Sequence, residues 1–227
     1  MARIEGITRS RSLLVRLVFF FSRRCYGRVI TPVRVYALHP RLLLAVGHME
    51  EVQEGARQLG ASVKQLARML VAWRIGCPWC LDFGTRASQD LLIADEQLRA
   101  LPDYEHSSLF SEEERAVLRY ADAMTTIPVQ VPDAVFTALQ AIYSDRQILE
   151  LTTAIAWENY HARVNHAFGL EAERGYGEAR LSGADARGAK RPTCSRRCLK
   201  RARETVKKRK DRTSTKEVDP CHKQPGH

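Results

Sequence analysis

Apolar residues recur at helical spacing along most of this chain, and no stretch keeps the strict alternation that is typical of a strand. Proline, glycine and capping residues divide the pattern into about eight segments joined by short links. We expect helices over residues 10–25, 40–60, 62–75, 78–94, 95–101, 111–124, 132–142 and 144–169. This pattern predicts an all-α helical bundle.

Residues at the segment ends support these boundaries. Proline suits the first turn of a helix, where its missing N–H costs nothing, and serine accepts hydrogen bonds at an N-cap. We therefore expect starts at Pro40 and Pro78, caps at Ser62 and Ser144, a capping box over Ser111–Glu114, and a break at Thr31-Pro32. In the last segment the predicted apolar stripe is Ile148, Leu151, Ile155, Ala156 and Tyr160.

Composition divides the chain into three parts. Residues 1–41 carry a net charge of +8, residues 42–179 a net charge of −9, and residues 180–227 a net charge of +11. The last part has almost no large apolar side chains, so it cannot bury enough surface to offset its conformational entropy. We predict a basic N-terminal helical extension at 1–39, a helical domain at 40–179 and a basic disordered tail at 180–227.

The basic tail could neutralise phosphates through runs such as Lys207–Lys210, so any contact with nucleic acid is expected there alone. No aromatic residue accompanies the basic ones, which argues against stacking on bases. Cys194, Cys198 and Cys221-His222 give only a faint metal-binding pattern. We favour a solvated, nonspecific extension.

Near the N-terminus, Leu13–Phe21 is apolar and follows basic residues, as in a signal peptide. It is nine residues long, Arg16 interrupts it, and no small-residue cleavage site precedes Arg23. A bilayer span needs about 20 residues. The segment therefore predicts an amphipathic helix that packs on the domain or on a partner subunit, with no membrane contact and a cytoplasmic location.

The chemistry of the chain centres on Cys77-Pro78-Trp79-Cys80. Two thiols at this spacing can close a disulfide and so exchange two electrons. If a helix begins at Pro78, its N-terminal partial charge favours the reactive thiolate. A thioredoxin would place the pair after a strand, which is not seen here. A structural, unreactive dithiol is the alternative, and no second Cys/His pair in the folded part suggests a metal site.

Three stretches carry a resemblance to a known family: Leu66–Gly84, Phe110–Ala121 and Leu149–Ala156. Through them, residues 40–172 resemble the carboxymuconolactone decarboxylase family, on its alkyl hydroperoxidase D-like side. The resemblance implies an all-helical bundle that assembles as homo-trimers or larger rings, often by helix exchange. The family includes peroxidases, decarboxylases and members of unknown role.

For the peroxidase members, the resemblance implies that Cys80 attacks a hydroperoxide and becomes a sulfenic acid, which Cys77 resolves to a disulfide. A dithiol donor, such as a lipoyl protein, then reduces the pair. No bound cofactor is expected.

Three departures from the family pattern weaken this expectation. The relay glutamate 12 residues before the first cysteine is Gln65, the histidine four residues after the second is Gly84, and Trp79 stands where a further histidine is frequent. Positioned acid and base groups typically contribute about 10²–10⁴ in rate. Peroxidase activity is therefore expected to be weak or to use other groups.

Glu158 and His161 could supply such groups, because their i, i+3 spacing places them on one helix face, with His166 further along. Both histidines could equally be polar residues at a helix end. Asp82 lies two positions after Cys80 and is expected to point elsewhere.

The leading prediction is thus a thiol-dependent, peroxidase-like enzyme that uses Cys77 and Cys80. The alternative is a non-catalytic oligomeric scaffold or small-ligand-binding protein of the same fold. A lactone decarboxylase or isomerase ranks last, because that chemistry also needs a base near the replaced positions.

Overall fold

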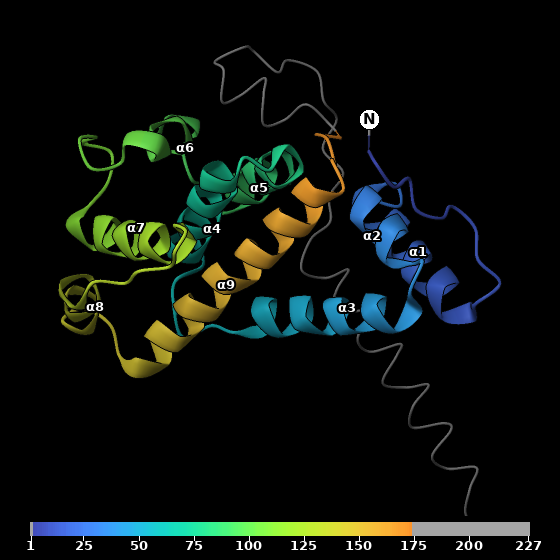
Figure 1. The fold of residues 1–227 in the computed structure, drawn as a ribbon, viewed down its shortest axis with the longest axis horizontal. Coiled ribbons are helices and arrows are strands. Elements are labelled where there is room, and N and C mark those ends of the chain that lie inside the picture. The colour runs from blue at the N-terminus through green and yellow to red at the C-terminus, as the bar shows by residue number, and fades with distance from the viewer. Residues whose placement is uncertain (1, 174–227) are drawn as a thin grey trace, which may run out of the picture.

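A computed structural model describes residues 2–173 of the chain, and this part consists of helices joined by short links (Figure 1). The predicted all-α bundle is confirmed. The tail at 180–227, with its predicted disorder, nucleic-acid contact and faint metal pattern, lies outside the described residues. The helices are α1 (Leu13–Tyr26), α2 (Thr31–Tyr36), α3 (Pro40–Gly55), α4 (Ala61–Ile75), α5 (Pro78–Asp90), α6 (Asp95–Ala100), the 3₁₀ turn η1 (Leu101–Asp103), α7 (Glu112–Thr125), α8 (Asp133–Gln140) and α9 (Asp145–Ala167).

Most of the predicted helix ends are confirmed. Ser111 and Glu114 form a reciprocal capping box at α7, and Ser144 does the same with Gln147 at α9. Pro40 and Pro78 occupy the first turns of α3 and α5. Hydrogen bonding of the free backbone N–H groups in the first turn therefore determines where these helices begin.

Four expectations at the helix ends were wrong. Thr31-Pro32 begins the short helix α2 instead of only breaking the chain, because proline fits its first turn. Ser62 lies inside α4, whose N-cap is Gly60. The helices α3 and α5 are also shorter than predicted and end at Gly55 and Asp90.

The core forms around α4, which packs against α9, α7 and α5 (Figure 1). Its side chains Leu66, Leu70 and Val71 are fully buried. On α9 the buried stripe includes Ile148, Leu151 and Ile155 as predicted, but Ala156 and Tyr160 are exposed. These two residues are displaced around the helix from the face that meets α4.

A buried ion pair links α4 to α9. Lys64 and Glu150 are both less than 10% exposed, and Lys64 Nζ donates to Glu150 and, at 2.7 Å, to the carbonyl of Ala56. Glu150 also accepts from the backbone N–H groups of Gln58 and Leu59. The pair therefore fixes the link between α3 and α4 against the long helix.

The N-terminal helices form a separate, smaller cluster at one side of the bundle (Figure 1). Val15 and Phe19 of α1 pack there against Ala37 and Leu43. In α3, however, only Leu43 and Gln53 are buried among 16 residues. Within residues 2–173, no helix combines the length and the apolar character that crossing a bilayer requires.

Candidate active site

The cysteine pair lies at the corner between α4 and α5. Gly76 ends α4 in the left-handed conformation, with φ at 73°, and turns the chain directly into Cys77. Cys77 is the N-cap of α5 and forms a disulfide with Cys80, with their Cα atoms 5.3 Å apart. Cys77 is fully buried and Cys80 is 5% exposed. The corner thus holds a disulfide, and solvent has slightly more access to Cys80 than to Cys77.

The start of α5 favours negative charge on sulfur. The Sγ of Cys77 accepts the backbone N–H of Cys80 at 3.2 Å, as an N-cap side chain does. The partial positive charge of the helix N-terminus acts on the same atoms. In the reduced state this arrangement stabilises the thiolate of Cys77, and a thiolate is the reactive form of cysteine.

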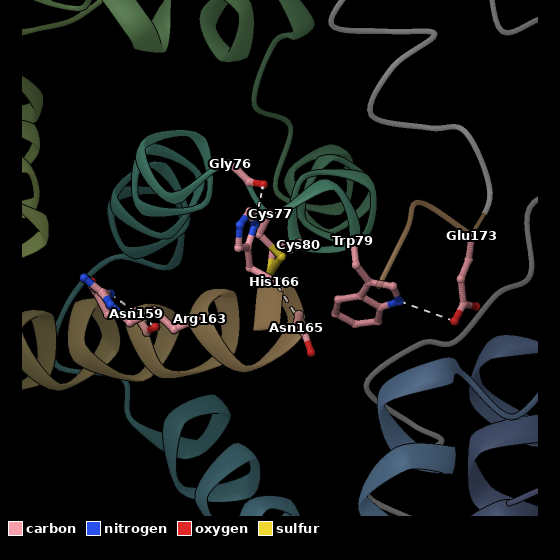
Figure 2. Close-up of a disulfide and its surroundings, with 9 residues drawn as sticks. All are labelled: Gly76, Cys77, Trp79, Cys80, Asn159, Arg163, Asn165, His166 and Glu173. Atoms are coloured by element: carbon pink, nitrogen blue, oxygen red, sulfur yellow. Dashed lines mark hydrogen bonds between the residues drawn. A yellow bond between two sulfur atoms is a disulfide. The ribbon is translucent and has the colours of Figure 1, made fainter. Parts of the chain in front are cut away.

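Two side chains from the end of α9 lie at the cysteine corner, one in contact with Cys80 and the other with Gly76 (Figure 2). Asn165, which is 1% exposed, donates from Nδ2 to the Sγ of Cys80 at 3.5 Å. Its Oδ1 is buried without a hydrogen-bond partner among the described residues. The Nδ1 of His166 lies 3.3 Å from the carbonyl oxygen of Gly76, a contact that requires the proton on Nδ1.

Gln65 and Gly84, which stand where the family has its relay glutamate and histidine, lie side by side. Gln65 on α4 donates from Nε2 to the carbonyl of Gly84 at 3.0 Å and to the hydroxyl of Ser88 at 3.2 Å. A Cβ on Gly84 would overlap the sulfur of Met69. The space that a histidine would need is therefore filled by Met69, and Gln65 ties α4 to α5.

Glu158 and His161 lie in a charged cluster with Glu50 of α3 and Arg68 of α4. His161 Nε2 is 2.7 Å from Glu50 Oε1. Burial raises the pKa of Glu158 to about 6, against the opposing pull of His161 and Arg68. Burial alone would also raise the pKa of Glu50, but its contact with His161 holds it below its usual range. Glu158 therefore changes its protonation state near neutral pH.

Trp79 lies outside the cysteine pair and forms a wall of a small pocket. It stacks on Phe83 with ring centroids 4.8 Å apart, and Tyr26 meets Phe83 edge-on at 5.5 Å. The indole Nε1 donates to Glu173 at 3.4 Å (Figure 2). Asp82 points to the same side and accepts the backbone N–H of Glu173 at 3.1 Å. Trp79 thus links the cysteine corner to the N-terminal helices.

The structure brings some of the expected residues together and separates others. Cys77 and Cys80 pair, and Gln65 reaches Gly84, whereas the recorded contacts of His161 are with Glu50 and neighbouring rings of α9. Sequence reasoning missed Asn165. Its position one turn after His161 was the only available signal.

The cysteine pair defines a small enclosed environment with apolar walls. Ala72 and Ala162 form one buried cluster with the two cysteines, and Ile75, Trp79 and Leu81 pack against this cluster. Among residues 2–173, no three His, Cys, Asp or Glu side chains group closely enough to hold a metal ion. The described residues thus offer thiols, an amide and an imidazole for chemistry here.

No family model matches the chain. The uncharacterized protein YnjA of Escherichia coli K12 is 32% identical over 162 residues, which cover 71% of this chain and 89% of YnjA. A protein of unknown function from Agrobacterium tumefaciens, ATU0492, provisionally described as the antioxidant defence protein AhpD, is 25% identical. It covers 61% of this chain and 94% of its own, with a TM-score of 0.58.

A third similar protein is the debrominase Bmp8, of which a cysteine-to-alanine variant was solved in complex with 2,3,4-tribromopyrrole. It is 20% identical, covers 80% of this chain and 97% of its own, and has a TM-score of 0.69. At this identity the likeness concerns the fold. The peroxidase-related protein from Silicibacter sp. TM1040 shares the same fold, with a TM-score of 0.69.

Proposed function

The chain belongs to the carboxymuconolactone decarboxylase family, on its alkyl hydroperoxidase D-like side, and on that basis we propose that it is a thiol-dependent oxidoreductase that reduces hydroperoxides. The observation that carries the proposal is the Cys77–Cys80 disulfide at the N-terminus of α5. A pair three residues apart at a helix N-terminus is suited to repeated oxidation and reduction.

In the proposed reaction, the thiolate of Cys80 attacks the terminal oxygen of a hydroperoxide ROOH. The O–O bond breaks, Cys80 becomes a sulfenic acid, and the alcohol ROH leaves after taking a proton. The thiolate of Cys77 then attacks the sulfenic sulfur and forms the disulfide, and the hydroxide that leaves takes up the proton lost by the Cys77 thiol to give water. A dithiol donor, for example of the lipoyl type, returns two electrons and two protons and is itself oxidised to a disulfide.

Access and hydrogen bonding support the first role for Cys80. Cys80 retains some exposure while Cys77 has none, and the amide of Asn165 donates to the sulfur of Cys80. Cys77, as N-cap, is held 5.3 Å away between Cα atoms, which suits a resolving thiol. Asn165 would stabilise the attacking thiolate by a hydrogen bond to charge.

Proton handling is the weak point of the proposed enzyme. Gln65 cannot take up a proton at neutral pH, and Met69 fills the space beside Gly84. Glu158 has a suitable pKa of about 6, but its electrostatic partners are His161, Arg68 and Glu50. We therefore expect Glu158 and His161 to serve the cysteines only through water, and turnover to be slow.

Steady-state turnover tests the proposal. Consumption of cumene hydroperoxide with dihydrolipoamide as donor should exceed the background rate for the native chain. Cys80→Ser and Cys77→Ser should both fall to background, and Cys25→Ser, which alters a buried cysteine in α1, should keep the native rate. Equal rates for the native chain and Cys80→Ser would exclude the proposed reaction.

The second candidate is a non-catalytic member that binds a small ligand or acts as an oligomeric scaffold. The packing of Met69 against Gly84 favours it, because the relay space is closed. Its expected result is one equivalent of disulfide formed with peroxide and no further turnover in the presence of the donor. Sustained turnover would exclude it.

We also propose that the protein is a homo-oligomer, of the trimeric or larger kind found in its family. The exposed apolar side chains of the N-terminal helices support this. They include Leu13 and Phe20 of α1 and Leu42, Leu44 and Val52 of α3, which are 71%, 59%, 50%, 47% and 48% exposed. An apolar surface of this kind is typical of subunit contacts.

A further inference from the structure

The pocket beside Trp79 holds a carboxylate that belongs to the chain itself. Its walls are the rings of Tyr26, Trp79 and Phe83, with Asp82 and Arg86 from α5 completing the lining. Glu173, six residues after the end of α9, lies in this pocket with its side chain 14% exposed. The pocket is therefore shallow because one of its own residues fills it.

Three groups converge on the carboxylate of Glu173. Arg28 Nη2 lies 2.7 Å from Oε2, and the backbone N–H of Thr31 donates to Oε1 at 2.5 Å. The indole Nε1 of Trp79 donates to the same Oε1 at 3.4 Å. These groups come from the α1–α2 link, the start of α2 and the cysteine corner. Together they form an anion site with an aromatic wall.

The engagement of Arg28 with Glu173 is incomplete. Both Arg28 Nε and Nη2 are buried without an aligned hydrogen bond among the described residues, although Nη2 lies close to Glu173 as an ion pair. Arginine pairs most strongly with a carboxylate when Nε and an Nη donate side by side to its two oxygens. Glu173 uses Oε1 for Thr31 and Trp79, so the tethered carboxylate is not aligned with either Nε or Nη2 of the fork. An untethered carboxylate can rotate to take both.

The charges of the lining also favour an anion once Glu173 leaves. Arg28 and Arg86 balance Asp82 and Glu173 in the present arrangement. Without Glu173 the lining carries a net charge of +1, beside stacked aromatic rings that accept a flat apolar group. The complementary ligand is a monocarboxylate attached to such a group.

We propose that this pocket is a binding site for a small aromatic or flat apolar carboxylate, and that Glu173 occupies it as an internal competitor. The inference goes beyond the proposed redox function and does not require it. Because Trp79 stands between the two cysteines in sequence and forms the pocket wall, a bound ligand lies against the outer side of the redox corner.

A binding experiment on the full chain tests the proposal, with benzoate as probe and uncharged benzamide as its control. The readout is the shift of the Trp79 indole N–H resonance in ¹H–¹⁵N spectra, assigned with Trp79→Phe. A short tether gives a competitor an effective concentration of about millimolar. Removing it in Glu173→Ala should therefore tighten benzoate binding about tenfold or more relative to the native chain. Glu171→Ala, an exposed acid two residues earlier, should bind as the native chain does.

Two further variants keep the test decisive. Glu173→Gln retains the shape of the side chain without its charge and should also bind benzoate more tightly than the native chain. Adding Arg28→Met to Glu173→Ala should abolish binding while helical content remains native. Equal affinity for benzoate in the native chain, Glu173→Ala and Glu173→Gln would overturn the proposal. Equal binding of benzamide and benzoate, or binding unaffected by Arg28→Met, would overturn it as well.

Discussion

At the scale of residues, Asn165 is the side chain whose amide contacts the sulfur of Cys80. Its buried amide donates to that sulfur, while its own Oδ1 lacks a partner in the described part of the chain. Burying an unpartnered polar oxygen costs about 1–3 kcal/mol, so packing alone does not favour asparagine here. This cost is consistent with a functional hydrogen bond to the thiolate.

Replacing Asn165 by alanine should therefore slow the reaction of Cys80. In a Cys77→Ser background, we expect alkylation of Cys80 by iodoacetamide at pH 7 to slow about tenfold, since a hydrogen bond to a charged group contributes about 1.5–3 kcal/mol. Peptide mapping by mass spectrometry gives the rate at Cys80. Asn159→Ala, on the same helix but bonded to Thr125 and Ile155, is the matched control and should leave the rate unchanged. An unchanged rate in Asn165→Ala would contradict this role.

Ionisation of Glu158 is expected to destabilise the fold as the pH rises, whereas most carboxylates stabilise the folded state when they ionise. Burial raises its pKa to about 6, so between about pH 4.3 and 6 the folded state holds a proton that the unfolded state releases. The free energy of unfolding therefore falls as the pH rises through this window. The side chain of Glu158 is half-buried. We therefore expect Glu158→Gln to raise the free energy of unfolding by about 1–2 kcal/mol at pH 7.5 and by little at pH 4.

Urea denaturation at both pH values measures this difference. Asp90→Asn, at an exposed position, should show no comparable change. If Glu158→Gln raised the free energy of unfolding equally at pH 4 and pH 7.5, the titration assigned to Glu158 would be contradicted.

Some of these residues could be predicted from sequence and others could not. Cys77 and Cys80 are close in the chain, so their pairing follows from local geometry. The contact between Asn165 and Cys80 joins positions 85 residues apart, and only the packing of α9 on α5 creates it. The filling of the Gly84 position by Met69 likewise depends on how α4 meets α5.

At the scale of elements, the link between α4 and α9 depends on the buried pair of Lys64 and Glu150. Burial by itself would raise the pKa of Glu150, but the hydrogen bonds from Lys64 and the backbone of Gln58 and Leu59 hold it below its usual range. This stabilisation is present above the unfolded pKa of about 4.3 and is lost as pH falls through the lower folded value.

Glu150→Leu should therefore lower the free energy of unfolding by about 3–5 kcal/mol, because it leaves the ammonium of Lys64 buried and unpaired. The double variant Lys64→Met, Glu150→Leu should recover most of this loss. Urea denaturation at pH 7 measures both. A double variant that is less stable than Glu150→Leu alone would contradict the explanation.

Element boundaries show what local sequence signals determine. Serine caps and proline at first turns predicted the starts of α5, α7 and α9, because these signals act within one turn of the helix. The early end of α5 depends on Leu92, which adopts a positive φ of 60° that its sequence does not favour. Leu92 itself is exposed, but the turn brings the next residue, Ile93, into the core, and the N–H of Ile93 donates to the carbonyl of Ser88.

At the scale of the whole molecule, the exposed apolar residues of α1 and α3 predict assembly. Leu44→Asp and Val52→Asp should each convert the oligomer to smaller species, because a charge at a subunit contact loses its hydration without gaining a partner. Light scattering coupled to size-exclusion chromatography gives the mass. Leu92→Asp, at a residue that is 93% exposed on the bundle, is the matched control and should keep the native mass. A native chain that is already monomeric would contradict the assembly.

The central claim is that Cys80 attacks the hydroperoxide and Cys77 resolves the sulfenic acid. Trapping the sulfenic acid tests this claim most directly. Cys77→Ser should be treated with one equivalent of hydroperoxide in the presence of dimedone, and the labelled cysteine identified by peptide mapping. We predict a dimedone adduct on Cys80 in Cys77→Ser and no adduct on Cys77 in Cys80→Ser. An adduct on Cys77 in Cys80→Ser, or none on Cys80 in Cys77→Ser, would contradict it.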